Sequence, residues 1–83
     1  MLEFKYDTQL LIEGKGLNED EIGEYIATNI EGDSLIAVGG DTLIKIHYHT
    51  NTPWKVLEYC AGLGDIYDVV VENMERQEQG LQG

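Results

Sequence analysis

Residues 39–50 read Gly-Gly-Asp-Thr-Leu-Ile-Lys-Ile-His-Tyr-His-Thr and combine a turn with a strand. The Gly-Gly-Asp triplet supplies residues that tolerate the positive φ angles of a tight hairpin. From Thr42 to Thr50 apolar and polar side chains alternate, as in a strand with one buried face. Because the short apolar run 34–38 precedes the turn, we predict an antiparallel hairpin with strands at 34–38 and 42–50.

The segment upstream of this hairpin predicts a strand followed by a helix. Residues 4–12 are rich in aromatic and β-branched side chains, and they end at the breaker sequence 14–16, Gly-Lys-Gly. Asn18 is suited to cap a helix, and Glu21, three residues later, completes a capping box. The apolar stripe of this helix, which ends near residues 31–33, consists of Ile22, Tyr25, Ile26 and Ile30.

The segment after the hairpin predicts a second helix. Asn51 or Thr52 is expected to cap it, and Pro53 suits its first turn because the N–H that proline lacks is unpaired there in any case. Gly62 and Gly64 are expected to end the helix in a left-handed conformation. The apolar side of this helix consists of Val56, Leu57, Cys60, Ala61 and Leu63.

Residues 65–73 predict a last strand, and the polar tail 74–83 is expected to fray. The element order is therefore βαββαβ, in which two right-handed crossovers place both helices on one face of a four-stranded antiparallel sheet. We expect an α+β fold, the ferredoxin-like sandwich, with strand order 4-1-3-2 and one sheet face without a helix. The 83 residues are expected to form a single small domain, too short for a two-domain enzyme with a cleft between its domains.

The charge and the cysteine content narrow the class of function. The chain has 5 basic and 16 acidic residues and a net charge of −11, so we expect neither nucleic acid nor anionic lipid as a partner. Cations, metal ions and basic protein surfaces are favoured instead. The single cysteine forms no intramolecular disulfide, and no apolar run approaches the roughly 20 residues of a membrane span. With no signal-peptide character in residues 1–5, these features predict a cytoplasmic protein without a membrane span.

Three polar side chains on the predicted open face of the sheet form a candidate metal site. Period two puts His47 and His49 opposite the apolar set of their strand, about 6 to 7 Å apart along it. The same alternation in the first strand puts Asp7 on that face, within cross-strand reach if the two central strands pair in register. Two His and one carboxylate leave a fourth position open, which is the layout of a catalytic zinc site. The alternative is a polar sheet face that is solvated or covered by a partner.

Other residues with reactive groups are more simply interpreted as structural. Cys60 lies on the apolar side of the second helix and is expected to be a buried, inert thiol. The Gly-Lys-Gly sequence at 14–16 lacks the spacing of a phosphate-binding loop. Asp33-Ser34 is interpreted as a turn, because no His lies nearby in the sequence to activate the hydroxyl. Trp54 and Tyr59 are expected to serve packing or partner contacts rather than ligand stacking.

The chain also resembles a known family along nearly its whole length. The matching segments are Gly32-Asp33-Ser34-Leu35-Ile36-Ala37-Val38, Leu43-Ile44-Lys45-Ile46-His47-Tyr48-His49-Thr50-Asn51-Thr52-Pro53, Val56-Leu57-Glu58-Tyr59 and Val71-Glu72-Asn73-Met74. The most specific part is the Lys-x-His-x-His-Thr sequence at 45–50, with a proline after it. These segments resemble the middle domain in the catalytic subunit of bacterial fatty acid kinase. That subunit is a DhaL-fused protein of the dihydroxyacetone-kinase-like family.

This resemblance implies a larger protein with three parts. An N-terminal helical DhaL-like kinase domain would bind ATP and magnesium, and a C-terminal domain would follow the middle domain. The family phosphorylates the carboxylate of a fatty acid that a separate DegV-type fatty-acid-binding protein presents, and the product is an acyl phosphate. ATP and Mg would therefore reach this chain only through the companion domain.

The resemblance also implies a metal. In the family, the middle domain carries a zinc site made of the two His of a His-x-His motif and a Cys in the first strand. His47 and His49 match this motif, whereas Asp7 stands where the Cys would be. A carboxylate is a harder ligand than a thiolate and suits several metals. Cys60 lies outside the motif and takes no such role.

Two hypotheses of function follow. In the first, the chain is a module of a fatty-acid-kinase-like protein that contributes a metal-bearing sheet face to phosphoryl transfer from ATP to a fatty acid carboxylate. We expect the isolated chain to be inactive, because it lacks a Gly-rich phosphate loop. In the second, it is a non-catalytic ferredoxin-like module whose open sheet face docks a protein or a small ligand. The metal content of the purified chain separates the two.

Overall fold

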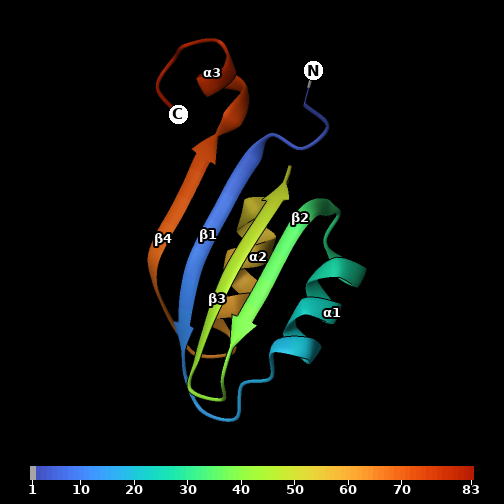
Figure 1. Ribbon diagram of the computed structural model, residues 1–83, viewed down its shortest axis with the longest axis vertical. Helices are drawn as coiled ribbons and strands as arrows, with labels where there is room; N and C mark the ends of the chain where they lie inside the picture. Colours follow the sequence, from blue (N-terminus) through green and yellow to red (C-terminus); the bar gives the residue numbers. More distant parts are fainter. Residues whose placement is uncertain (1) are drawn as a thin grey trace.

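The computed structural model describes residues 2–83. The chain folds into one sheet with two long helices and a short C-terminal helix (Figure 1). The elements, in chain order, are β1 (Tyr6–Glu13), α1 (Glu19–Asn29), β2 (Gly32–Gly39), β3 (Leu43–Thr50), α2 (Pro53–Ala61), β4 (Asp65–Asn73) and α3 (Met74–Glu78). The predicted βαββαβ order is confirmed, with α3 added at its end.

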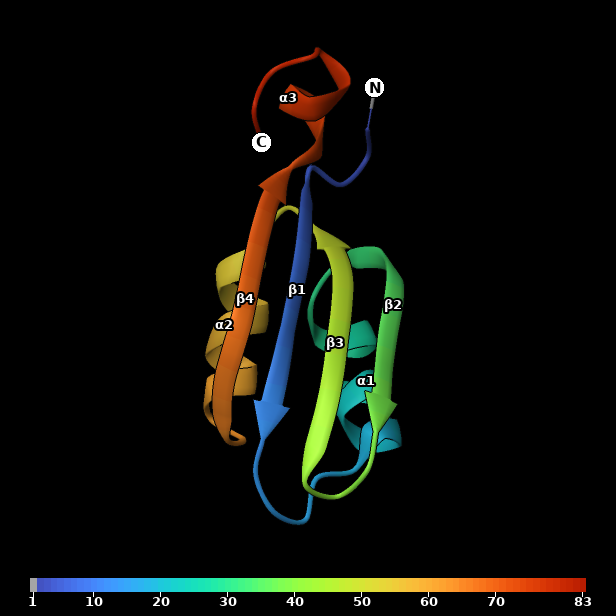
Figure 2. The same ribbon diagram turned by 60° about the vertical axis from the view of Figure 1, so that its left-hand side comes forward.

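The four strands form an antiparallel sheet in the order β2-β3-β1-β4. This is the expected order 4-1-3-2 counted from the other edge, so the ferredoxin-like α+β fold is confirmed. Both long helices lie behind the sheet when it is turned toward the viewer (Figure 2). The opposite face has no helix over it from residues 2–83, and we refer to it as the open face.

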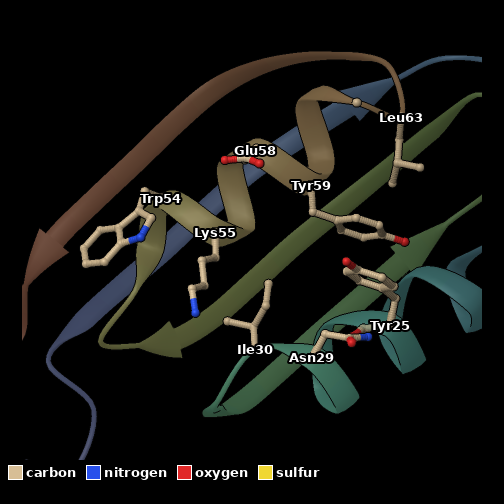
Figure 3. Close-up of a pocket in the computed structure, with 9 residues that line it drawn as sticks. Tyr25, Asn29, Ile30, Trp54, Lys55, Glu58, Tyr59 and Leu63 are labelled. Atoms are coloured by element: carbon tan, nitrogen blue, oxygen red, sulfur yellow. The ribbon is translucent and has the colours of Figure 1, made fainter.

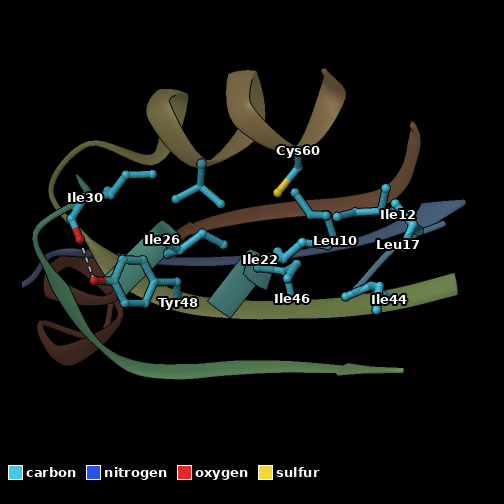
Figure 4. Packing of buried hydrophobic residues seen from close by; sticks show 11 residues of the cluster. Leu10, Ile12, Leu17, Ile22, Ile26, Ile30, Ile44, Ile46, Tyr48 and Cys60 are labelled. Atoms are coloured by element: carbon cyan, nitrogen blue, oxygen red, sulfur yellow. Dashed lines mark hydrogen bonds between the residues drawn. The ribbon is translucent and has the colours of Figure 1, made fainter. Parts of the chain in front are cut away.

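The hydrophobic core lies between the two long helices and the inner face of the sheet (Figure 4). Alternation in β1 and β3 sends every second side chain toward it, and the helices close it from above. The Tyr48 hydroxyl donates a 2.5 Å hydrogen bond to the Ile30 carbonyl, which ties β3 to the end of α1. The buried cluster consists of Leu10, Ile12, Leu17, Ile22, Ile26, Ile30, Ile44, Ile46, Tyr48, Val56 and Cys60.

The start of each long helix follows the prediction more closely than the end of α2. The Asn18 side chain accepts a 3.0 Å hydrogen bond from the Glu21 N–H, as expected of an N-cap. Thr52 is the N-cap of α2, but within residues 2–83 its side chain makes no capping hydrogen bond. The left-handed stop predicted for α2 is wrong. Gly62 has a right-handed φ of −74°, and Gly64 is required for space, because a Cβ there would meet the Glu13 carbonyl.

Three boundaries also differ from the prediction. β1 begins at Tyr6 rather than at residue 4, because the Lys5 N–H donates to the Asn51 side chain at 2.8 Å. β2 extends from Gly32 to Gly39, since its first residues also pair with β3. The tail expected to fray contains α3, whose start is capped by the Asn73 side chain at 3.0 Å from the Arg76 N–H. Among residues 2–83, no helix is long and apolar enough to cross a bilayer.

Candidate metal centre

The two central strands bring the predicted site residues together. In the antiparallel register of β1 and β3, Asp7 lies directly opposite His49, and Gln9 lies opposite His47. Since Thr8 and Tyr48 point into the core, the period of two sends these four side chains to the open face. The face is turned toward the viewer in Figure 2.

The donor atoms of Asp7, His47 and His49 lie within 4.8 Å of one another. The Nε2 atoms of His47 and His49 are 3.0 Å apart. Oδ1 of Asp7 lies 3.4 Å from the His47 Nε2 and 3.9 Å from the His49 Nε2. Two zinc–ligand bonds of about 2.0 to 2.1 Å at a tetrahedral angle separate their donor atoms by about 3.3 Å. The observed separations scatter around this value, so the three residues fit a zinc ion with only small side-chain rotations.

The surroundings of the three side chains leave room for a further ligand. Between 18% and 25% of each side chain is exposed, so the donor atoms are neither sealed in the core nor free in solvent. Without an ion, one imidazole can donate a hydrogen bond to the other across the 3.0 Å gap. With an ion, both Nε2 atoms and the carboxylate are on the same side of it, and the fourth position faces outward.

Two neighbouring residues contact the candidate ligands, and sequence reasoning assigned neither of them to the site. The Gln9 amide donates to the Asp7 carboxylate at 3.2 and 3.4 Å. Oδ1 of Asp33 lies 3.6 Å from Nδ1 of His49. Gln9 follows from the alternation that placed Asp7, because it lies two residues further on the same face. Asp33 was interpreted as a turn residue, whereas it belongs to β2 and pairs with His49.

Cys60 is not part of this centre. Its side chain is fully buried among the core residues, on the helix side of the sheet. Burial raises the pKa of its thiol to about 12, so the thiol remains protonated at neutral pH. The prediction of a buried, inert thiol is therefore supported by its surroundings.

A groove of about 630 Å³ lies between α1 and α2, on the helix side of the sheet (Figure 3). Tyr25 of α1 and Tyr59 of α2 stack across it, with ring centroids 3.9 Å apart and planes inclined by 11°. Trp54 and Lys55 line it near the start of α2. None of the three candidate metal ligands lines this groove, so it and the metal centre occupy opposite sides of the molecule.

Comparison with known proteins assigns the chain to a family. The model of the FakA-like middle domain, a domain of fatty acid kinase, matches residues 3–81. The chain belongs to this family. The resemblance carried by the His-x-His strand and its neighbouring segments is thereby confirmed, and this FakA-like middle domain has the antiparallel sheet described above.

Relatives of this middle domain occur in staphylococci. An uncharacterized protein of Staphylococcus haemolyticus (strain JCSC1435) is 40% identical over 48 residues, and one of Staphylococcus aureus (strain USA300) is 38% identical over 48 residues. Each match covers 58% of this chain and 9% of the relative. The chain thus spans about a tenth of the length of the curated relatives it matches.

Proposed function

We propose that the chain is the module of a fatty-acid-kinase-like protein that contributes a metal-bearing sheet face to phosphoryl transfer from ATP to a fatty acid carboxylate. The observation that carries this proposal is the convergence of Asp7, His47 and His49 on the open face, at separations that suit one metal ion. Membership of the fatty acid kinase family supplies the reaction class. The donor set of two imidazoles and one carboxylate suits zinc.

Each residue has a distinct part in this proposal. The two Nε2 atoms anchor the ion, because both rings project from one rigid central strand. The Asp7 carboxylate adds negative charge and holds the third position from β1. A bound zinc ion acts as a Lewis acid that polarises an oxygen of the fatty acid carboxylate or of the transferred phosphoryl group. The outward-facing fourth position is where this chain would receive such an oxygen.

The remaining parts of the reaction come from outside the chain. No Gly-x-x-x-x-Gly-Lys-Ser/Thr sequence is present, so this chain supplies no phosphate loop for ATP. We assign ATP and magnesium to an N-terminal DhaL-like domain of the parent protein, and the fatty acid to a DegV-type binding protein. A C-terminal domain completes the parent protein, and the need for ATP places it in the cytoplasm. The purified 83-residue chain alone is expected to transfer no phosphate.

The decisive experiment is metal analysis of the chain purified without a nickel column. We expect about one zinc per chain in the wild type and none in His47→Ala or His49→Ala. Asp7→Cys should tighten zinc binding, because a thiolate is the softer ligand. Lys45→Ala is the matched control, since Lys45 projects from the same face of β3 and contacts none of the donor atoms. In the intact kinase, the two His variants should lose activity and Lys45→Ala should retain it.

A docking function is the second candidate, and one observation favours it. Large apolar side chains are exposed around the candidate ligands on the open face, where an unbound domain would ordinarily expose few. A wild-type chain that takes up no zinc, manganese or iron would contradict the metal proposal and favour docking. These exposed side chains are Ile36, Val38, Leu43, Tyr67 and Val70.

A further inference from the structure

Strand β2 changes its register beside the candidate metal centre. Ile36 pairs with His47, so an uninterrupted ladder would bring Ser34 opposite His49. Instead Asp33 lies opposite His49, because one extra residue of β2 is accommodated between Asp33 and Ile36. Ser34 has a φ of 56°, a left-handed value that residues other than glycine seldom adopt. Bulges of this kind redirect a side chain at the edge of a sheet.

The bulge places a carboxylate against the far side of the His49 ring. Oδ1 of Asp33 lies 3.6 Å from Nδ1, while Nε2 of the same ring faces His47 and Asp7. This Asp33–His49 separation slightly exceeds a hydrogen bond. The Asp33 side chain is 56% exposed, so its carboxylate has the freedom to rotate toward the ring. Such contacts commonly tighten when a site is loaded.

We propose that Asp33 is a positioning residue for the metal centre: it accepts a hydrogen bond from the Nδ1–H of His49 and thereby fixes the tautomer whose Nε2 lone pair faces the metal. This inference rests on the proposed function. A carboxylate partner orients a ligating imidazole and raises its basicity. Serine, which the uninterrupted register would place there, carries no charge and has a shorter side chain. The strained backbone at Ser34 therefore has a consequence for the site, since it exchanges a hydroxyl for a carboxylate.

The first test compares zinc affinities of the purified chain by competition with a chromophoric chelator. Asp33→Ala should weaken zinc binding by about 10- to 100-fold, the usual effect of removing an outer partner of a metal ligand. Asp33→Asn should lose less, because its amide oxygen still accepts a hydrogen bond. Glu24→Gln is the control for net charge, as Glu24 is an exposed residue of α1 on the other side of the sheet. It should bind zinc as the wild type does.

The second test measures the His49 tautomer by long-range ¹H–¹⁵N correlation of the metal-free chain, with the imidazoles neutral. We expect the hydrogen on Nδ1 in the wild type and a shift toward Nε2 in Asp33→Ala. An unchanged tautomer, or an unchanged zinc affinity in Asp33→Ala, would overturn the role of Asp33. If His47→Ala abolishes zinc binding while Asp33→Ala leaves it intact, only this inference fails. Zinc binding retained in His47→Ala would contradict the proposed function itself.

Discussion

Cys60 shows how a single side chain is excluded from chemistry by its place in the fold. It is the one cysteine of the chain, and it lies in the middle of the core with 0% of the residue exposed. Loss of water around the sulfur disfavours the thiolate, which raises the pKa of Cys60 to about 12. A thiol that keeps its proton is neither a nucleophile nor a ready metal ligand. The metal chemistry proposed for this chain therefore uses nitrogen and oxygen donors.

The first prediction concerns the reactivity of this thiol. Native protein at neutral pH should resist alkylation by iodoacetamide, whereas protein unfolded in urea should react as a free cysteine does. The free energy of unfolding should fall as the pH rises from about 9 to about 12, because the unfolded chain releases the thiol proton first. Cys60→Ala should lack this part of the pH dependence. Rapid labelling of the native chain would contradict the burial of Cys60.

The second prediction concerns Gly32, at the start of β2. A Cβ at this position would meet the His49 carbonyl and lie 2.6 Å from Cζ of Tyr48. Gly32→Ala should therefore lower the free energy of unfolding by about 1 to 3 kcal/mol, as overpacking does elsewhere. Gly40→Ala is the matched control, because a Cβ at Gly40 has no neighbour within 4 Å among residues 2–83. Chemical denaturation of the two variants measures the difference.

At the scale of elements, β3 serves the core and the site at once. Its even-numbered residues from Ile44 to Thr50 are buried, while His47 and His49 face outward between them. Tyr48 lies between the two His in sequence and reaches across the core to the end of α1 (Figure 4). The position of the imidazoles is thus fixed by a strand held on its other face.

The third prediction tests that connection. Tyr48→Phe removes the donor to the Ile30 carbonyl and leaves this buried acceptor unpaired. We expect the free energy of unfolding to fall by about 1 to 3 kcal/mol in urea denaturation. Tyr67→Phe provides the comparison, since Tyr67 is 39% exposed on β4. Equal stabilities of the two variants would show that the hydrogen bond contributes little.

The sequence predicted the elements that depend on local patterns. Alternation located β3, and the cap at Asn18 located α1, because both signals lie within a few residues. The face shared by Asp7 and the two His followed from the same alternation and from the strand order. The Asp33 contact did not, because it depends on a bulge that forms only when β2 pairs with β3. The missed helix α3 did carry a local signal, the Asn73 cap before the helix-forming run 74–78.

At the scale of the whole molecule, the sheet separates stability from chemistry. The buried cluster lies on the helix side, and the candidate metal ligands lie on the open face. Only Thr8, between Asp7 and Gln9, brings an unpaired hydroxyl into the interior of the described chain. Folding therefore has its main driving force in the core rather than in a metal ion.

The fourth prediction follows from this separation. Zinc at about 100 times its dissociation constant should stabilise the chain by about 2.7 kcal/mol and raise Tm by roughly 10 to 20 °C. Removal of zinc with a chelator should lower Tm but leave the far-ultraviolet circular dichroism unchanged at 25 °C. His49→Ala should show no zinc-dependent change in Tm. Unfolding of the chain upon chelation would contradict the separation.

The fifth prediction concerns the buried hydroxyl of Thr8. Valine has nearly the same shape and no polar atom to desolvate, so Thr8→Val should raise the free energy of unfolding by about 1 kcal/mol. Thr8→Ser, which keeps the hydroxyl and loses a methyl group, should lower it instead. Urea denaturation of both variants gives the sign. A destabilised Thr8→Val would indicate that the hydroxyl has a partner such as a bound water.

The outward half of β1 and β3 is, in consequence, an interchangeable cassette for protein engineers. Asp7, Gln9, His47 and His49 occupy four facing positions that no core contact requires. A designer can exchange them in combination without repacking the interior. Gln9→His would offer a third imidazole beside His47, and Asp7→Cys with Gln9→Cys would turn the same backbone toward softer metals. The small domain thus provides a ready scaffold for comparing ligand sets on an unchanged frame.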